Sequence, residues 1–314
     1  MKRFLKLLGL LLLPATLAAG VWLWTPDRPR AELEALYLED VGDLRMIDGV
    51  RLHVREAGDT DAPAVIMLHG FGASLHTWDG WAAELDDAFR VIRFDLPGSG
   101  LSYPDPTGDY SDERAVQLLA ALMDELGLAR AALVGNSIGG RIAWRMAAMY
   151  PQRVSALVLV SPDGFASEGF EYGKAPEVPA VMGLMRYALP KSVLAMNLAP
   201  AYADANKLSE DRVTRYHDLM LAPGSREALL QRMAQTVLVD PEPLLRQISA
   251  PVLLLWGESD RMIPVGNAAD YQAALPNSRL VRLPDLGHVP QEEDALRSAA
   301  PVRKFLRAVL LPTP

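Results

Sequence analysis

The chain of 314 residues contains no cysteine and only five scattered histidines. Zinc sites with recognised cysteine or histidine spacing, including H-E-x-x-H, are therefore excluded. The sequence also lacks a long basic run and carries a formal net charge of −8, which argues against nucleic acid as a partner. Hydrophobic residues, in contrast, are abundant and make up 50% of the chain, so we expect a globular protein with a sizeable core. We expect neither a metal nor another cofactor.

The N-terminus combines a short basic start with an uncharged apolar run. Residues 7–24 contain no charged side chain over 18 positions, which is just long enough to span a membrane. The small residues Ala18-Ala19-Gly20 also fit a cleavage site, so a secreted protein with a cleaved signal is the alternative. The run nevertheless continues to Trp22 and Trp24, a residue type that favours the membrane interface. We predict a signal-anchor over residues 1–24, with the remainder on the exported side.

Apolar strands and amphipathic helices alternate along most of the remaining chain. After a linker at residues 25–43, the alternation runs through 44–164, stops in the proline-containing segment 165–245 and resumes over 246–314. Continuous apolar strands that alternate with helices predict an α/β fold with a mostly parallel, doubly wound sheet covered on both faces. The interruption holds helix-like pieces and no convincing strand, which predicts an inserted helical cap.

The first strands of the folded part are expected to form a hairpin. Asp48-Gly49 lies between two short apolar runs and is typical of a two-residue turn. The alternation from Val50 to Val54 then predicts one wet face, with His53 at the surface.

The strongest motif lies between Gly135 and Gly139. A strand that ends at Val134 meets a helix that begins at Ile138 without a loop, so Ser137 must absorb a tight reversal. Glycines two positions before and after a serine fit the strained strand-to-helix turn of the G-x-S-x-G pattern. At a helix N-terminus, the free backbone N–H of Ile138 favours an oxyanion.

A second glycine-containing segment, His69-Gly70-Phe71-Gly72, follows a buried strand. If the N–H of Phe71 converges with that of Ile138, two donors complete an oxyanion hole. His69 at the strand end is predicted to be a packed, hydrogen-bonded histidine and not a base.

Polar residues also follow two later strands. Asp260 and His288 each come shortly after an apolar run. Because the carboxyl ends of parallel strands share one edge of a sheet, both are expected beside Ser137.

The candidate substrate contacts come from the cap and from one helix start. Met182, Met185 and Tyr187 are predicted to line an apolar pocket, since methionine is a deformable filler at binding surfaces. The alternative is that they form the cap's own small core. His76 begins an amphipathic helix after the second glycine segment and is predicted at the pocket mouth, with a helix-surface position as the alternative.

Together these segments resemble the α/β-hydrolase superfamily, in its cap-bearing serine esterase and lipase branch. The resemblance spans residues 44–310 and lies in five motifs that occur in the family's order, namely His69-Gly70-Phe71-Gly72, Asp95-Leu96-Pro97-Gly98-Ser99-Gly100, Gly135-Asn136-Ser137-Ile138-Gly139-Gly140, Gly257-Glu258-Ser259-Asp260 and Gly287-His288.

The resemblance implies a role for each polar residue at the sheet edge. Ser137 would be the nucleophile, His288 the general base and then acid, and Asp260 the group that orients the imidazole. The amides of Phe71 and Ile138 would be the oxyanion donors. Asp163 follows the strand after the nucleophile helix and is a second candidate for the acid.

These residues predict a serine hydrolase that cleaves small, apolar carboxylic esters through an acyl-enzyme. A hydrolase of carbon–carbon bonds in ring-cleavage products uses the same three residues and is one alternative, although export argues against it. A catalytically silent binding protein that uses only the fold is another. The acyl chain length, the alcohol and the oligomeric state are left open.

Overall fold

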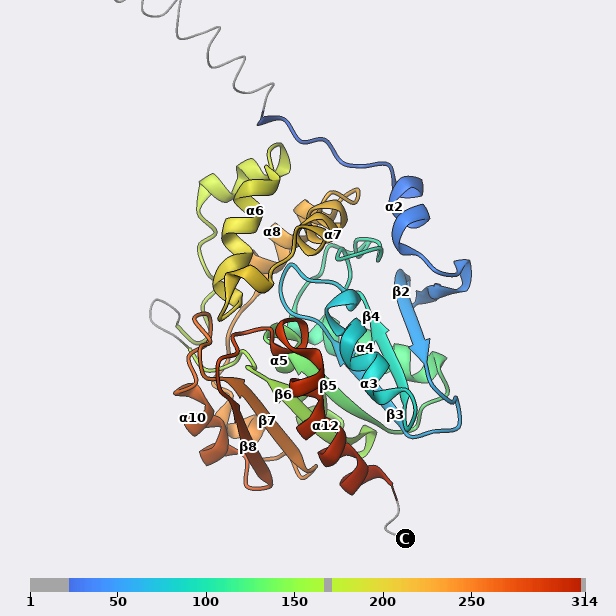
Figure 1. Ribbon diagram of the computed structural model, residues 1–314, viewed down its shortest axis with the longest axis vertical. Coiled ribbons are helices and arrows are strands. Elements are labelled where there is room, and N and C mark those ends of the chain that lie inside the picture. Colours follow the sequence, from blue (N-terminus) through green and yellow to red (C-terminus); the bar gives the residue numbers. More distant parts are fainter. Residues whose placement is uncertain (1–22, 167–170, 312–314) are drawn as a thin grey trace, which may run out of the picture.

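The computed structural model describes residues 23–166 and 171–311. Its centre is an eight-stranded sheet in the order β1-β2-β4-β3-β5-β6-β7-β8 (Figure 1). β2 pairs antiparallel with both of its neighbours, β1 and β4, and the strands from β3 to β8 pair in parallel with one another. The predicted mostly parallel sheet is therefore confirmed. The strands are β1 (Leu44–Ile47), β2 (Val50–Ala57), β3 (Ala64–Leu68), β4 (Arg90–Phe94), β5 (Ala131–Asn136), β6 (Val154–Val160), β7 (Val252–Gly257) and β8 (Ser278–Leu283).

Helices flank the sheet and form the cap. The α-helices are α2 (Arg30–Tyr37), α3 (Asp79–Leu85), α4 (Asp112–Glu125), α5 (Ile138–Met149), α6 (Lys191–Leu198), α7 (Glu210–Met220), α8 (Ser225–Gln235), α9 (Glu242–Leu245), α10 (Asn267–Ala274), α11 (Pro290–Glu293) and α12 (Ala295–Leu310). The 3₁₀ turns are η1 (Val41–Asp43), η2 (Leu75–Trp78), η3 (Pro151–Arg153), η4 (Ala180–Arg186), η5 (Ala199–Ala201) and η6 (Ala205–Lys207).

Successive residues of the central strands face two separate cores. In β3, Ile66 and Leu68 pack in the core that includes residues of α4, α5 and α10, whereas Val65 and Met67 face α3 and α12. All five residues of β3 are buried because helices cover both faces. The cap lies over the upper end of the sheet in Figure 1, above the points where the parallel strands end.

The cap is formed by the chain between β6 and β7. In the described part of this stretch there are helices, from η4 to α9, and no strand. Figure 1 places α6, α7 and α8 together at the end of the molecule where the described chain begins.

The predicted hairpin is present, but the expected position of His53 is wrong. Asp48 and Gly49 adopt positive φ angles of 43° and 84°, as a two-residue hairpin turn requires. His53 is fully buried, with Nδ1 2.8 Å from Oδ2 of Asp95. The alternation predicted a wet face because it carries no information about the loop after β4, whose Asp95 covers this side of β2.

The segment expected to be a linker, residues 25–43, contains helix α2 and packs on the rest of the chain. Leu33 is fully buried against Leu101, Leu219 and Ala222. It therefore contributes to a small core between the main domain and the cap, which a free stalk would not do.

An extended segment before α2 ties the same region to the cap. We call this segment, together with α2 and Leu38, the N-terminal strap (residues 23–38). The Thr25 N–H donates to the carbonyl of Tyr187 at 2.8 Å. Arg226, which is buried, donates to the Thr25 carbonyl at 2.8 Å and to Oδ1 of Asp27 at 2.6 Å. The strap is thus joined to the cap by hydrogen bonds at Thr25 and Asp27.

No helix within residues 23–166 and 171–311 has the length and apolar character needed to cross a membrane. The predicted anchor over residues 1–24 lies almost entirely outside this range, so it stays a prediction.

Candidate active site

The tight turn predicted at Ser137 is present at the junction of β5 and α5. Ser137 has φ 55° and ψ −121°, a strained conformation for a residue with a side chain. A Cβ atom on Gly135 would lie 2.3 Å from the Gly139 carbonyl oxygen, and one on Gly139 would lie 2.3 Å from the Leu68 carbonyl oxygen. Both positions therefore require glycine, and the strain is held in place by the packing of strand against helix.

His288 and Asp260 form a buried pair. Nδ1 of His288 lies 2.8 Å from Oδ2 of Asp260, whose side chain is fully buried. The other carboxylate oxygen of Asp260 accepts the N–H groups of Met262 at 2.8 Å and Ile263 at 2.9 Å. A carboxylate can only accept hydrogen bonds, so the imidazole nitrogen that faces Asp260 must carry a proton. The proton of the neutral ring is therefore held on Nδ1, which leaves Nε2 as an acceptor.

The loop that carries His288 is fixed by two hydrogen bonds from other elements. Asn136, which precedes the nucleophile, donates from Nδ2 to the His288 carbonyl at 3.0 Å. The His288 N–H donates to the Ala201 carbonyl of η5 in the cap at 2.7 Å. Asn136 did not figure among the predicted site residues, although a polar residue at the end of a buried strand was a usable signal.

Asp163, the second candidate for the acid, is engaged elsewhere. Its carboxylate pairs with the buried guanidinium of Arg141 in α5. Only its backbone N–H approaches the nucleophile, with a bond of 3.0 Å to the Ser137 carbonyl. Among the residues that the structure describes, His288 therefore has one carboxylate partner, Asp260.

Ser137 and His288 both line an apolar cavity of about 290 Å³ beneath the cap. None of the described residues around it is a lysine or an arginine. Pockets that are mostly apolar with a few convergent polar groups are typical of small-molecule sites. The lining residues are Gly70, Phe71, Gly72, Ala73, Asn136, Ser137, Met182, Met185, Leu189, Leu194, Asn197, Leu198, Ala201, Tyr202, Tyr216, Met220, Leu229, Met262, His288 and Val289.

The two segments expected to supply oxyanion donors meet at the nucleophile. Phe71 lines the cavity, and Ile138 is the first residue of α5. A Cβ atom on Gly70 would lie 3.4 Å from the Ser137 Cβ. The loop after β3 therefore runs directly against the nucleophile.

His69 is a packed histidine, as expected. It is fully buried, its Nδ1 donates to the Gly70 carbonyl at 2.8 Å, and its Nε2 accepts the Leu96 N–H at 3.0 Å. Burial lowers the pKa of His69, so the ring is neutral and both nitrogens are occupied. Its role is to join the loops after β3 and β4.

Of the four predicted substrate contacts, two line the cavity and two do not. Met182 and Met185 are in its wall. His76 is buried outside it, with Nδ1 3.1 Å from Oδ2 of Asp79, because η2 turns this side chain toward α3. Tyr187 is 55% exposed and stacks on Trp24, with ring centroids 6.0 Å apart. The structure therefore does not bring His76 and Tyr187 to this cavity.

A buried polar cluster at the cavity was also missed. Tyr202 and Tyr216 both donate to the carboxylate of Glu292, and Nε of Arg212 lies 3.3 Å from it. Burial, together with Glu292, raises the pKa of both tyrosines well above the usual range, so they remain neutral donors. The sequence did offer a hint, because Glu292 follows His288 by only four residues.

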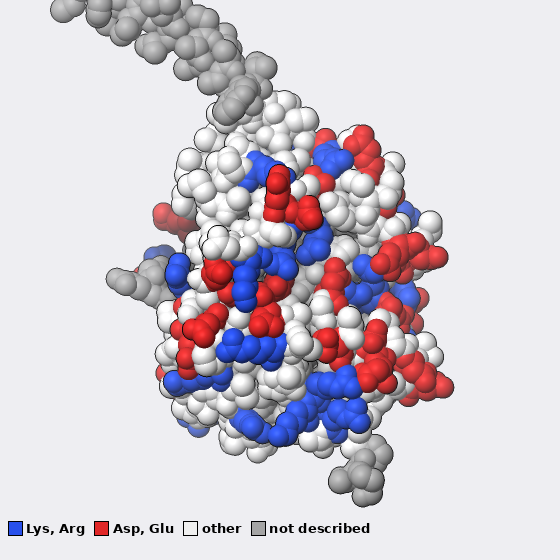
Figure 2. All heavy atoms as spheres, in the orientation of Figure 1, with Lys and Arg blue, Asp and Glu red and all other residues white. Residues whose placement is uncertain are grey.

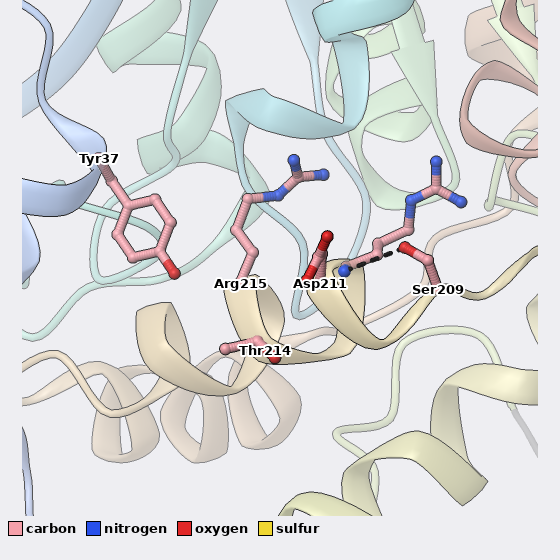
Figure 3. Close-up of a pocket in the computed structure, with 6 residues that line it drawn as sticks. Tyr37, Ser209, Asp211, Thr214 and Arg215 are labelled. Atoms are coloured by element: carbon pink, nitrogen blue, oxygen red, sulfur yellow. Dashed lines mark hydrogen bonds between the residues drawn. The ribbon is translucent and has the colours of Figure 1, made fainter.

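A second hollow, of about 410 Å³, lies between α2 and α7 (Figure 3). It is polar and carries both signs of charge, and Figure 3 shows the Arg215 side chain beside Tyr37 there. The Tyr37 hydroxyl donates to Asp218 at 2.9 Å, and burial together with Asp218 raises the pKa of Tyr37 to about 12. None of the residues expected to carry the chemistry lines it, so the apolar cavity is the candidate active site. Its lining residues are Tyr37, Ser209, Asp211, Arg212, Thr214 and Arg215.

Comparison with known proteins also indicates the α/β-hydrolase fold. The family model for the alpha/beta hydrolase fold matches residues 63–295. A 2-hydroxy-6-oxononadienedioate/2-hydroxy-6-oxononatrienedioate hydrolase of Burkholderia vietnamiensis is 31% identical over 269 residues, which cover 82% of this chain and 91% of that protein.

Two solved structures extend the comparison. A thermophilic esterase from Thermogutta terrifontis has a TM-score of 0.69 and 27% identity, and the match covers 83% of this chain and 94% of that one. A bacterial membrane phospholipase A has a TM-score of 0.74 and 26% identity, and the match covers 99% of this chain and 100% of that one.

Proposed function

This chain belongs to the α/β-hydrolase family, and from that premise we propose that it is a serine hydrolase that cleaves carboxylic esters through an acyl-enzyme. The observation that carries the proposal is the buried pair of His288 and Asp260, 2.8 Å apart, at the cavity lined by Ser137. A serine hydroxyl is a weak nucleophile at neutral pH and needs an adjacent base held in one tautomer. The likeness to a thermophilic esterase supports the ester as substrate.

The proposed reaction runs in two halves. Oγ of Ser137 attacks the ester carbonyl carbon while Nε2 of His288 takes its proton, and the N–H groups of Phe71 and Ile138 stabilise the oxyanion. The imidazolium then gives the proton to the departing alcohol, which leaves an acyl-serine. Water attacks this ester with His288 again as base. The acid departs, and the proton returns to Ser137.

The lining of the cavity supports an apolar acyl group. Met182, Met185, Leu189 and Leu194 contribute hydrophobic side chains from the cap. A chain of methylene groups gains about 0.8 kcal/mol for each group that it buries in such a lining. The likeness to a membrane phospholipase A over nearly the whole chain favours a membrane lipid as the source of that acyl group.

A second candidate function is the hydrolysis of a carbon–carbon bond. It is favoured by the 31% identity with the Burkholderia vietnamiensis hydrolase, whose named substrate is a dienedioate. Binding such a dianion in a buried site calls for cationic partners. The described wall of the cavity contains no lysine or arginine, so this candidate ranks second.

A fluorophosphonate probe and a series of p-nitrophenyl esters, from acetyl to lauroyl, test the proposal. We expect covalent labelling at Ser137 and turnover that improves with acyl length until the cavity is full. Absence of both labelling and turnover in folded protein would reject the serine hydrolase. Turnover of a dienedioate with inert esters would favour the carbon–carbon hydrolase.

The wall of the cavity should set the acyl length that is accepted. Leu194, which is 5% exposed and lines the cavity, offers a test. We expect Leu194→Trp to fill part of the space and lower kcat/KM for the longest ester about tenfold or more relative to the acetate. Its neighbour Val193 points outward, at 46% exposure, so Val193→Trp should leave the ratio unchanged. Equal effects of the two variants would show that this part of the cap does not bind the acyl chain.

We also propose that residues 1–24 anchor the protein in a membrane, with the catalytic domain on the exported side. The full chain should then sediment with membranes and resist carbonate extraction, and its N-terminal peptide should be retained in mass spectra. A mature N-terminus near Val21 in a soluble exported fraction would instead identify a cleaved signal and leave the catalytic proposal untouched.

A shortened chain provides the matched control for the anchor. Starting the chain at Leu23 keeps the strap residues Thr25 and Asp27, which bind Arg226. We expect it to be soluble and active on the acetate ester. A start at Pro29 removes these contacts and should lower the thermal stability of the cap.

A further inference from the structure

Two elements of the cap present apolar side chains on both faces. In η4, Met182 and Met185 line the cavity. The alternate residues Val181 and Leu184 are 66% and 60% exposed. The element is therefore apolar toward the substrate and apolar toward the outside.

Helix α6 repeats the pattern. Leu194 is 5% exposed and lines the cavity, whereas Val193 and Met196 are 46% and 73% exposed. Only residues 187–190 separate η4 from α6, so the two apolar outward faces are close together along the chain. A surface helix of a soluble protein normally turns its polar residues outward, and an extended apolar surface marks an interaction site.

The N-terminal strap enters the molecule at this surface. Trp24 stacks on Tyr187 of the cap, and the Thr25 hydroxyl accepts the Leu189 N–H at 3.1 Å. We define the cap tip as the exposed apolar residues Trp24, Val181, Leu184, Tyr187, Val193 and Met196. Figure 1 shows α6 at the end of the molecule where the described chain begins, and Figure 2 shows a largely uncharged area directly beside that start, with charged side chains to its right and below it.

We propose that the cap tip inserts into the surface of a lipid bilayer, so that an acyl chain passes from the bilayer between η4 and α6 to Ser137. The proposal rests on the ester hydrolase and the anchor proposed above. Its occupant is set by the chain itself, because the uncharged run over residues 7–24 ends at Trp24, within the cap tip. A bilayer that holds this run lies against the outward faces of η4 and α6. Trp24 and Tyr187 are residue types that favour the membrane interface.

The absence of cysteine makes a direct test possible, since one introduced thiol is unique. The full chain is placed in vesicles of dioleoylphosphatidylcholine and dioleoylphosphatidylglycerol, with an environment-sensitive fluorophore on Met196→Cys. The control is Ala308→Cys, an exposed position on α12 at the far end of the molecule (Figure 1). We expect a blue-shifted emission and quenching by brominated lipids at position 196 and neither at position 308.

Other occupants of the cap tip give different results. A water-like label at position 196 on vesicle-bound protein would overturn the proposal while the anchor stands. A label that is shielded without lipid would also overturn it. Shielding that grows with protein concentration would assign the surface to a second copy, and shielding at every concentration would assign it to residues 1–22. Failure of the chain to bind vesicles would overturn both the proposal and the anchor.

Activity gives a second, independent readout. The double variant Val193→Asp with Met196→Asp places charge on the cap tip without touching the cavity wall. We expect hydrolysis of p-nitrophenyl palmitate held in the vesicles to fall about tenfold or more, because charge is costly in the bilayer. Turnover of p-nitrophenyl acetate in water should be unchanged.

Met46→Asp, at a 58% exposed position on β1, controls for added charge and should match the wild type on both esters. Equal palmitate turnover by the double variant and the wild type would overturn the proposal, as would a wild type that cleaves only the acetate. A wild type inactive on both esters would reject the ester hydrolase itself, whatever the position of the label.

Discussion

Ser137→Ala is expected to abolish ester hydrolysis and fluorophosphonate labelling, with a fall in kcat of roughly 10⁴- to 10⁶-fold. The change removes a single oxygen from a turn whose backbone is fixed by Gly135 and Gly139, so the fold should persist. Activity is measured on purified protein with p-nitrophenyl esters, and circular dichroism and the melting temperature report on the fold. His288→Ala should lose nearly as much activity, because nucleophile and base act as a unit.

Ser161 provides a matched control. Like Ser137, it directly follows a parallel strand and has a positive φ, here 41°, but it is fully buried and does not line the cavity. Ser161→Ala should therefore keep wild-type activity to within a few fold. Undiminished turnover by Ser137→Ala would show that another residue is the nucleophile. Equal losses at Ser137 and Ser161 would point to damage at the strand ends in general.

Features that depend on local chemistry could be predicted from the sequence. The turn at Ser137 follows from a strand that meets a helix with glycines on both sides, and the close approaches of Gly135 and Gly139 in the structure supply the reason. The parallel sheet follows from apolar runs, because strands covered on both faces have no polar face.

Features that depend on how an element is rotated or covered could not be predicted. His53 is buried because the loop with Asp95 covers its side of β2, and a period of two residues cannot reveal that loop. Tyr187 and Met185 lie two residues apart in the same cap segment, yet only Met185 lines the cavity. Tyr187 instead stacks on Trp24 of the strap, which is distant in sequence.

The choice between two acids illustrates the same limit. Asp163 and Asp260 each follow a strand at the edge where Ser137 lies, so position alone admits both. The distinction comes from Arg141 of α5, which pairs with Asp163 and leaves Asp260 to His288. Only a three-dimensional arrangement shows which carboxylate already has a partner.

Asp260→Asn and Asp163→Asn should therefore separate catalysis from stability. An amide at position 260 can donate to Nδ1 of His288, which moves the imidazole proton to Nε2 and removes the acceptor for the serine proton. We expect kcat to fall roughly 10³- to 10⁴-fold, with little change in the melting temperature. The measurements are kcat on a short p-nitrophenyl ester and the urea midpoint for each purified variant.

Asp163→Asn should show the opposite profile. It weakens a pair with Arg141, but Arg141 keeps a bond of 2.9 Å to Asp112 and the Asp163 side chain is 27% exposed. The free energy of unfolding should fall by about 1 kcal/mol. Turnover should stay within a few fold of the wild type, because His288 keeps its partner. Similar losses of kcat in both variants would leave the assignment of the acid without support. A larger loss of kcat at position 163 than at position 260, at unchanged stability, would transfer the role to Asp163.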